Sequence, residues 1–436
     1  MDWSYEESLK YLHGMPRTRS RPGIDRMLRF CGYLGNPHLK LSGRFLHVAG
    51  TNGKGSACAM LTSVLREAGL DIGAFISPYI MEFRERIAFN GAFITEEEVC
   101  RYTRRLRDAV RQMERETGEK PIEFELVCGM GLLFFAERMP DLIVCEAGMG
   151  GRNDPTNIIQ PILSIIMRID YDHMELLGTS IEEIASEKAG IIKQNTPVVL
   201  YPDQYPEAMR VLTSACKSVH APFRIPDIMG LSELPSDPFF PAFHYRKETY
   251  TLSLAGRHQI LNASCIIEAV DLLREKGIAV DSAALSRGLR RAFLPARLER
   301  LSQCPLILLD GAHNASGVRA LTDTLRQESG GRPLAVLCGM LEDKHPDTAL
   351  PSLFTLDNLS YAACVPVHSP RSADPGRLCT LFRANGIQSG VYADSDTALD
   401  AVLQKTGNEG IGVCFGSLYL ASDIRRYFGR IRTDGV

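Results

Sequence analysis

The stretch RFLHVAGTNGKGS (residues 44–56) decides the fold of this chain. An apolar run (44–49) passes directly into a glycine-rich segment (50–56), as a buried strand passes into a turn. Beyond the turn, apolar side chains recur at the spacing of one helix face; they are Ala57, Met60, Leu61, Val64, Leu65 and Ala68. Gly69 then stands where helices commonly end. The stretch therefore predicts a strand, a glycine-rich loop and an amphipathic helix.

The same alternation of apolar strands and helical patterns continues along the chain. Further buried strands are predicted at 71–77, 141–148, 162–170 and 196–201. Helices are predicted near 95–117, 123–139, 180–190, 205–219 and 258–276. Strands that alternate with helices indicate an α/β fold with a mainly parallel sheet covered on both faces.

A break and a restart divide the chain. Residues 224–256 are rich in proline and aromatic side chains, and HYRKETYTLSLAG (244–256) predicts an antiparallel hairpin. A second α/β series then begins near residue 297. Its predicted strands are 306–313, 333–340, 359–367, 390–395 and 410–417. The restart predicts two domains, residues 1–295 and 296–436.

Composition excludes several classes of protein. The 436 residues are 45% hydrophobic and 23% charged, with a formal net charge of -3, which gives no reason to expect a nucleic acid or an anionic membrane as partner. The start MDWSYEESLK lacks the basic and apolar regions of a secretory signal, and no apolar run reaches the roughly 18 residues of a membrane span. The twelve cysteines form no Cys-x-x-Cys pair. We therefore expect a cytoplasmic protein with free thiols.

The glycine-rich loop carries the strongest chemical signal. A loop between a strand and a helix presents backbone N–H groups and the positive end of the helix to a phosphate group. Asn52, Gly53 and Gly55 would form this cradle, Lys54 would neutralise the β- and γ-phosphates, and Ser56 would bind Mg²⁺. Two residues separate the first glycine from Gly-Lys, where the usual P-loop has four. The alternative is a glycine-rich turn with an incidental lysine.

Two further polar residues follow apolar strands. Glu146 comes after LIVC and His173 after ILSIIMRIDYD. The carboxyl ends of parallel strands are where α/β sheets place ligands, and a carboxylate suits Mg²⁺ better than an imidazole does. The alternatives are a solvated carboxylate at a strand end and a structural histidine.

Nine stretches together resemble one family. Beside HVAGTNGKGS, they are GIDRMLRFCGYLGNPH (23–38), SPYIMEFRERIAFNG (77–91), EAGMGGRNDPTN (146–157), DYDHMELLGTSIEEIASEKAGIIK (170–193), GRHQILNA (256–263), PARLER (295–300), DGAHN (310–314) and FGSLYL (415–420). The chain is similar in all of them, and in order, to the folylpolyglutamate synthase/dihydrofolate synthase branch of the Mur ligases. The resemblance covers almost the whole chain.

This resemblance implies a fold and an activity. The fold is a P-loop-type Mur-ligase central domain with a mainly parallel sheet, followed by a smaller Rossmann-like domain. The activity is ATP-dependent ligation of L-glutamate to dihydropteroate, to the γ-carboxyl of a reduced folate, or to both, through an acyl phosphate. A monomer that binds small molecules, with neither nucleic acid nor membrane as partner, is the expectation.

The resemblance also implies a metal site for Mg²⁺, with two ions expected. Ser56, Ser77, Glu146, His173 and a carbamylated Lys188 match the family's metal-binding positions. For Lys188, in SEKAGIIK, the residues alone favour an ordinary surface lysine. The family motif reads Ser-Pro-His at 77–79, but residue 79 is a tyrosine here. The role of the family's histidine is therefore not carried over to Tyr79.

Nucleotide and substrate positions follow from the same resemblance. For ATP, the family's contacts beyond the loop match Asn262, Arg297 and Asp310. For the pterin they match Phe124, Asn153, Asp154 and Pro155, although the family more often reads Leu-Asp-Ala at 153–155. Phe124 is an equally good core residue, and the alternative for Arg297 is a solvated interdomain arginine. His313 and Ser417 are candidates for placing glutamate, with His313 acting beside the catalytic Lys54 and Lys188.

Two other functions remain alternatives. A different Mur-family amino-acid ligase would share the phosphate loop and the metal ligands but would not bind a pterin. A nucleotide-binding regulator without ligase chemistry would need the loop but not Glu146, His173 and Lys188.

Overall fold

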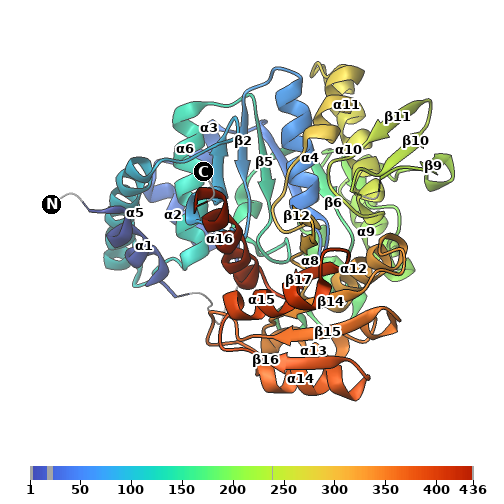
Figure 1. Cartoon of the computed structure of the whole chain (residues 1–436). Helices are drawn as coiled ribbons and strands as arrows, with labels where there is room; N and C mark the ends of the chain where they lie inside the picture. The colour runs from blue at the N-terminus through green and yellow to red at the C-terminus, as the bar shows by residue number, and fades with distance from the viewer. Residues whose placement is uncertain (1–2, 17–22, 238, 435–436) are drawn as a thin grey trace. The chain divides into compact units, whose positions relative to one another are not determined.

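A computed structural model describes residues 3–16, 23–237 and 239–434 of the chain (Figure 1). They divide into two compact α/β units. The first comprises residues up to 232 together with 244–250 and 261–292, and the second comprises 233–243, 251–260 and the residues from 293 onward. The second series of strands therefore starts near the expected restart, and the second unit also includes two short segments from the predicted hairpin region.

The first unit is built on an eight-stranded sheet in the order β4-β3-β2-β5-β1-β6-β7-β8. Its strands are β1 Phe45–Ala49, β2 Ile72–Phe75, β3 Ile87–Phe89, β4 Ala92–Phe93, β5 Leu142–Glu146, β6 Pro161–Ile166, β7 Val198–Leu200 and β8 Phe223–Arg224. In this order, β2, β5, β1, β6, β7 and β8 pair in parallel. The strands β3 and β4 at one edge pair antiparallel. All five residues of β1 are buried, so both sheet faces are covered there.

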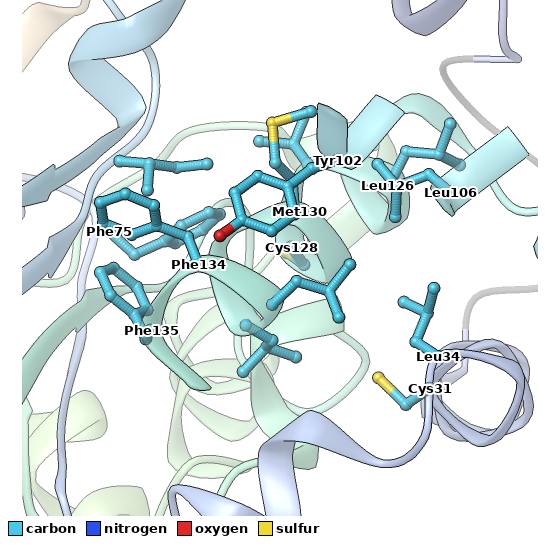
Figure 2. Packing of buried hydrophobic residues seen from close by; sticks show 14 of the residues in the cluster. Cys31, Leu34, Phe75, Tyr102, Leu106, Leu126, Cys128, Met130, Phe134 and Phe135 are labelled. Carbon is cyan, nitrogen blue, oxygen red and sulfur yellow. The ribbon is translucent and has the colours of Figure 1, made fainter. Parts of the chain in front are cut away.

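The helices of the first unit bury their apolar faces on this sheet and on each other. They are α1 Tyr5–His13, α2 Ile24–Tyr33, α3 Pro37–Lys40, α4 Lys54–Glu67, α5 Glu96–Thr117, α6 Glu123–Arg138, α7 Met174–Leu177, α8 Ile181–Ala189, α9 Pro206–Ser218, α10 His258–Glu275 and α11 Ser282–Arg291. Figure 2 shows Phe134 and Phe135 of α6 packed near Phe75 of β2 and Tyr102 of α5 in the largest of these cores. The predicted face of α4 is buried as expected, and Gly288 of α11 packs against Val64, where a Cβ would lie 2.3 Å from its Cα.

The predicted hairpin is present. Strands β9 Leu231–Leu234, β10 Ala242–Tyr245 and β11 Glu248–Thr251 form a three-stranded sheet in the order β11-β10-β9. Two residues connect β10 to β11, a connection too short for anything but an antiparallel pair.

The second unit contains a six-stranded sheet in the order β12-β13-β17-β14-β15-β16. Its strands are β12 Glu299–Gln303, β13 Leu306–Leu309, β14 Leu334–Cys338, β15 Leu359–Cys364, β16 Gln388–Val391 and β17 Ile411–Phe415. Its helices are α12 Ala315–Glu328, α13 Pro346–Ala349, α14 Pro375–Ala384, α15 Ser395–Thr406 and α16 Leu418–Asp434. Only β12 runs antiparallel to its neighbour. The predicted α/β class with mainly parallel sheets is thus confirmed.

Two expectations about the chain's chemistry can be compared with these units. All twelve cysteines are free, and eleven of them are at least partly buried. Among the described residues, no helix has the length and apolar character that crossing a membrane requires.

Candidate functional site

The glycine-rich loop joins β1 to α4 as predicted. Gly50 (φ 151°) passes so close to Met167 that a Cβ would lie 2.7 Å from the Met167 Cβ, and Gly53 (φ 85°) caps the start of α4 in the left-handed region. The carbonyl of Arg168 accepts hydrogen bonds from the amides of Thr51 (2.8 Å) and Asn52 (3.1 Å). The loop is therefore pinned to the segment after β6, and the positive end of α4 begins at Lys54.

Two lysines donate to carbonyl groups of this loop. Lys54 Nζ lies 3.2 Å from the Thr51 oxygen, and Lys188 Nζ, at the end of α8, lies 2.9 Å from the Gly50 oxygen. The Lys188 side chain is only 3% exposed, so the alternative of a surface lysine is wrong. Burial, assisted by the charge of Lys54, lowers the pKa of Lys188 to about 7, against the opposing effect of Asp172. A large share of Lys188 is therefore an uncharged amine near neutral pH.

Glu146 and Ser77 lie together at the carboxyl edge of the sheet. Glu146 ends β5 and is 5% exposed, and one of its carboxylate oxygens accepts a hydrogen bond from the Ser77 amide at 3.2 Å. Ser56 is buried in the first turn of α4, which begins next to the loop after β1. Because β5 pairs with both β1 and β2, these segments meet at one edge. The buried carboxylate and hydroxyls are hard oxygen donors of the kind that Mg²⁺ takes.

His173 stands at the start of α7 and is more exposed than the residues of that group. Its side chain is 42% exposed, and its Nε2 lies 3.7 Å from a carboxylate oxygen of Asp172. In the part of the chain that the structure describes, no three His, Cys, Asp or Glu side chains are arranged to hold a metal ion. The oxygen donors at the sheet edge therefore fit Mg²⁺ by their chemistry, with hydroxyl groups completing the set, while His173 stays a prediction.

Sequence reasoning gave Arg86 no role, although it lies inside the motif SPYIMEFRERIAFNG. Its Nη1 donates to the Ser77 hydroxyl at 3.4 Å, and its guanidinium lies over the ring of Tyr79, 5.1 Å from the centroid. Its Nε is buried without a hydrogen-bond partner among the described residues, and burial lowers its pKa. The histidine position of the family motif is therefore taken here by an aromatic ring stacked on a partly buried cation.

The predicted pterin residues surround the loop after β5. Asp154 is 3% exposed and accepts hydrogen bonds from the amides of Met149 (2.8 Å) and Thr156 (3.0 Å). A Cβ on Gly148 would lie 2.5 Å from the Phe124 ring and 3.2 Å from a carboxylate oxygen of Asp154. Phe124 also packs on Phe75 with centroids 6.1 Å apart. Phe124 therefore reaches from the core to the same loop as Asp154.

The neighbours of Asp154 in sequence point in different directions. Asn153 donates a hydrogen bond of 3.4 Å to Glu187, whereas Pro155 starts a short 3₁₀ turn that Asp154 caps. Burial raises the pKa of Asp154, and hydrogen bonds from the Thr156 hydroxyl and from the amides of Met149, Thr156 and Gly148 oppose that rise. The carboxylate is held as a fixed acceptor.

Asn262 of α10 lies against the phosphate loop. It is 3% exposed, and its Oδ1 is 2.7 Å from the place that a Cβ on Gly53 would occupy. Asn262, which was predicted to bind the nucleotide from outside the loop, therefore packs directly against the loop.

In the second unit, Asp310 follows β13 and is held by backbone groups. Its two carboxylate oxygens accept from the amides of Leu298 and Ala312, each at 2.8 Å. The guanidinium of Arg297 lies against Gly311, where a Cβ would be 2.4 Å from its Nη1. Burial raises the pKa of Asp310, and Arg297 is the strongest opposing influence.

His258 also belongs to this cluster. It lies in the motif GRHQILNA, where sequence reasoning gave it no role. Burial and the charge of Arg297 lower its pKa to about 4, so it is neutral. His313 donates from Nδ1 to the Gly311 carbonyl at 2.7 Å, which assigns its tautomer. Ser417, 3% exposed, lies between β17 and α16 and accepts from the Tyr419 amide at 3.1 Å.

Two family models match the chain. The model of the Mur ligase middle domain matches residues 48–270, and that of the Mur ligase glutamate ligase domain matches residues 296–418.

Relatives match it over nearly its full length. The dihydrofolate synthase/folylpolyglutamate synthase of Bacillus subtilis (strain 168) is 36% identical over 97% of this chain and 99% of its own. A Mycobacterium tuberculosis folylpolyglutamate synthase complexed with ADP and AMPPCP superposes with a TM-score of 0.87 at 28% identity, covering 98% of this chain and 99% of that one. Escherichia coli FolC in complex with DHPP and ADP gives a TM-score of 0.86 at 25% identity, covering 99% of both chains.

Proposed function

This chain belongs to the dihydrofolate synthase/folylpolyglutamate synthase family of Mur ligases, and we propose that it ligates L-glutamate to dihydropteroate and to the γ-carboxyl of reduced folates at the expense of ATP. It is an ATP-dependent acid–amino-acid ligase. One observation carries the assignment of its site. Lys54, Glu146 and Asp154 follow strands β1 and β5 at the carboxyl edge of one sheet, and Lys188 on α8 donates to the phosphate loop at the same edge.

The reaction needs an activated carboxylate. A carboxylate oxygen of the pterin substrate attacks the γ-phosphorus of ATP, the bond to the bridging oxygen breaks, and ADP leaves. The amine of glutamate then attacks the acyl carbon, phosphate departs, and the amine loses a proton to give the amide. Catalysis of such phosphoryl transfer rests on positioning and on neutralising the crowded oxygens.

The phosphate loop supplies both needs. Lys54 projects from the first turn of α4, where the helix's positive end also favours anionic phosphate. Its hydrogen bond to the Thr51 carbonyl holds the ammonium group beside the loop. Asn52, Gly53, Gly55 and Ser56 complete the cradle, and Asn262 on α10 reads the nucleotide from beside Gly53.

Mg²⁺, as two ions, would be held by Glu146, the hydroxyls of Ser56 and Ser77, His173 and the modified Lys188. Such an ion neutralises charge on the transferred phosphoryl group. Two hydrogen bonds keep Ser77 in place. Its backbone N–H donates to Glu146, and its hydroxyl accepts from Arg86.

Lys188 has the properties that carbamylation requires. Its uncharged amine adds to the carbon of CO₂, and one proton is released to give an anionic N-carboxylate. The lowered pKa supplies the uncharged amine near neutral pH. The carbamate nitrogen keeps one hydrogen, so the bond to the Gly50 carbonyl survives the modification, and the new negative charge relieves the repulsion from Lys54.

The pterin end binds at the loop after β5. Asp154 is a fixed acceptor for the paired N–H donors of an aminopyrimidine edge. Phe124 stacks on the ring from the other side of Gly148, and Asn153 and Pro155 flank the carboxylate.

The second unit supplies further nucleotide and amino-acid contacts. Arg297 pairs with phosphate and Asp310 accepts from the ribose hydroxyls, while His313 and Ser417 place glutamate. We assign the phosphate loop, the metal-binding positions and the pterin positions to a central domain of residues 1–295, and these further contacts to a domain of residues 296–436. Twelve free cysteines support work in the reducing cytoplasm, and we propose that the protein acts as a monomer.

ADP release by the purified protein tests the function. MgATP and L-glutamate are supplied with dihydropteroate, with tetrahydrofolate, or with neither. We expect release with each pterin and little without. Lys54→Met should lower kcat by roughly 10²–10³, whereas Lys40→Met, a change at an exposed lysine at the end of α3, should behave as wild type.

The three reactions distinguish the possible activities of the enzyme. Stimulation by one pterin alone reduces the assignment to a single activity of the family. If neither pterin stimulates release while ATP and glutamate are saturating, the folate assignment fails and a different amino-acid ligase is indicated.

A further inference from the structure

A buried chain of hydrogen bonds leads from the central strand to Asp154. His47, on β1, is fully buried, and its Nε2 lies 2.9 Å from the Thr156 hydroxyl. That hydroxyl lies 2.5 Å from a carboxylate oxygen of Asp154, which also accepts from the Thr156 amide. The chain therefore connects the sheet interior to the carboxylate beside Phe124.

The donors in this chain can be assigned. An ionised carboxylate only accepts, and a threonine hydroxyl has a single hydrogen to donate. The hydroxyl of Thr156 therefore donates to Asp154, and its oxygen accepts from His47. His47 must then carry its proton on Nε2. Burial, with the charge of Lys193, holds the pKa of His47 near 3, so the ring is neutral and has just one proton to give.

The arrangement is costly for a structural role alone. With its proton on Nε2, His47 leaves Nδ1 buried without a hydrogen-bond partner among the described residues. An unsatisfied buried polar atom destabilises the folded state, and a leucine would fill a β1 position without that penalty. Among the described residues, the hydrogen-bond partner of the ring is the Thr156 hydroxyl, which donates to Asp154.

We propose that His47 is a positioning residue for the pterin, acting through Thr156 on Asp154. A hydroxyl rotates freely unless its oxygen is engaged. The His47 N–H occupies that oxygen and directs the hydroxyl proton to Asp154, while the Met149 amide fixes the second carboxylate oxygen. Asp154 is thereby locked in one orientation as an acceptor. This inference rests on the proposed function, because it takes Asp154 to bind the pterin.

Matched substitutions test the chain of bonds. His47→Leu removes the donor, whereas His47→Gln keeps an N–H near the position of Nε2. Thr156→Val removes the hydroxyl at constant shape, whereas Thr156→Ser keeps it. We expect Thr156→Val to raise KM for the pterin about tenfold, the loss of a single charge-assisted bond, and His47→Leu, which removes the neutral bond that directs that hydroxyl, to raise it by up to the same factor. KM for ATP and kcat should change far less.

The pattern across the variants decides between positioning and mere stability. Thr156→Ser and His47→Gln should restore most of the pterin KM, and the double variant His47→Leu/Thr156→Val should be no worse than Thr156→Val. A destabilised protein lowers the amount of active enzyme but not the KM of the folded fraction. If His47→Leu does not fold, the Thr156→Val and Thr156→Ser pair still gives the answer.

Asp154→Asn separates this inference from the function. If Asp154→Asn raises the pterin KM and Thr156→Val leaves it unchanged, the positioning role is wrong and the pterin site stands. If the wild type shows no pterin-dependent ADP release, the proposed function itself has failed.

Discussion

The loops that follow β1 and β13 both contain a tightly packed glycine, but they bind side chains of different chemistry. Both loops contain a glycine that leaves no room for a Cβ, Gly53 beside Asn262 in one and Gly311 beside Arg297 in the other. After β1, loop carbonyls accept from the ammonium groups of Lys54 and Lys188. After β13, backbone amides near the strand end donate to the carboxylate of Asp310. The first loop thus holds cations and the second holds an anion.

The charges around the two buried groups differ in a way that indicates chemistry. Asp310 has the opposite charge of Arg297 as its neighbour, which offsets the cost of burial. Lys188 has the like charge of Lys54, which adds to that cost. A buried ion pair is a common structural device, whereas a buried cation with a cationic neighbour is retained where an altered pKa is used. The β1 loop should therefore govern the reaction and the β13 loop should govern binding and local stability.

The largest expected effect is at Lys188. Lys188→Met removes the amine, its carbamate and one hydrogen bond to the phosphate loop, and should lower kcat by roughly 10²–10³, the loss typical of removing one preorganised charged group. Wild-type activity should also fall when CO₂ is depleted and return with bicarbonate. Steady-state ADP release in CO₂-free and bicarbonate buffers, with mass spectrometry of the peptide that contains Lys188, measures both.

Lys193→Met is the matched control for this change. Lys193 is also partly buried and donates to a backbone carbonyl, that of Asn157, at 3.0 Å, but it does not touch the loop. It should keep the wild-type kcat and the CO₂ response. Equal losses in the two variants would mean that any buried lysine in this region matters, and the contrast between the two loops would lose its basis.

Stability should respond to pH with a definite sign. Lys188 has a folded pKa of about 7 and an unfolded pKa near 10.4, so the unfolded chain binds more protons between these values and stability rises with pH there. In CO₂-free buffer, Lys188→Met should raise Tm most at pH 7 and below. The gain should vanish as the pH approaches about 10.4. A gain that is independent of pH would contradict the lowered pKa.

A smaller effect is expected at the start of α4. Gly53→Ala forces a Cβ into the left-handed region, at a cost of about 1–2 kcal/mol, and onto the Asn262 amide. KM for ATP should rise roughly tenfold as the loop or Asn262 shifts. Gly69→Ala, at the other end of the same helix, has a similar φ of +83° but nothing within 4 Å of the added Cβ. That control should lower Tm and leave KM for ATP unchanged, and equal KM values in the two variants would exclude a role for the Gly53–Asn262 contact.

The contrast between loops also explains how far the sequence could be read. The strand, loop and helix of residues 44–67 follow from local spacing, because each interaction that defines them spans only a few residues. The burial of Lys188 does not, since it depends on α8 packing so that its Nζ reaches Gly50, 138 positions away in sequence. SEKAGIIK alone therefore favoured a surface lysine, and only the family resemblance pointed to its modification.

The sequence indicates least about residues whose contacts depend on strand pairing. His47 reads as one member of an apolar strand, and its partner Thr156 comes within reach only because β1 pairs with β5 and β6. Arg86 sits in a charged run, where burial is not expected. The N-terminal helices and the β3–β4 edge were not predicted either, although α2 buries Met27, Phe30 and Cys31 at helical spacing.

The smallest effect is expected at Asp310. Asp310→Asn keeps the shape but turns one acceptor into a donor that faces the amide of Leu298 or of Ala312. One buried N–H is then left unsatisfied, at about 1–3 kcal/mol, so Tm should fall while kcat at saturating ATP changes little. Asp394→Asn changes an exposed helix cap in the same unit, where asparagine caps as well as aspartate does, and should leave Tm unchanged. If Asp310→Asn instead abolished kcat as Lys188→Met does, both loops would take part in the chemical step, and the division between a loop that reacts and a loop that binds would be wrong.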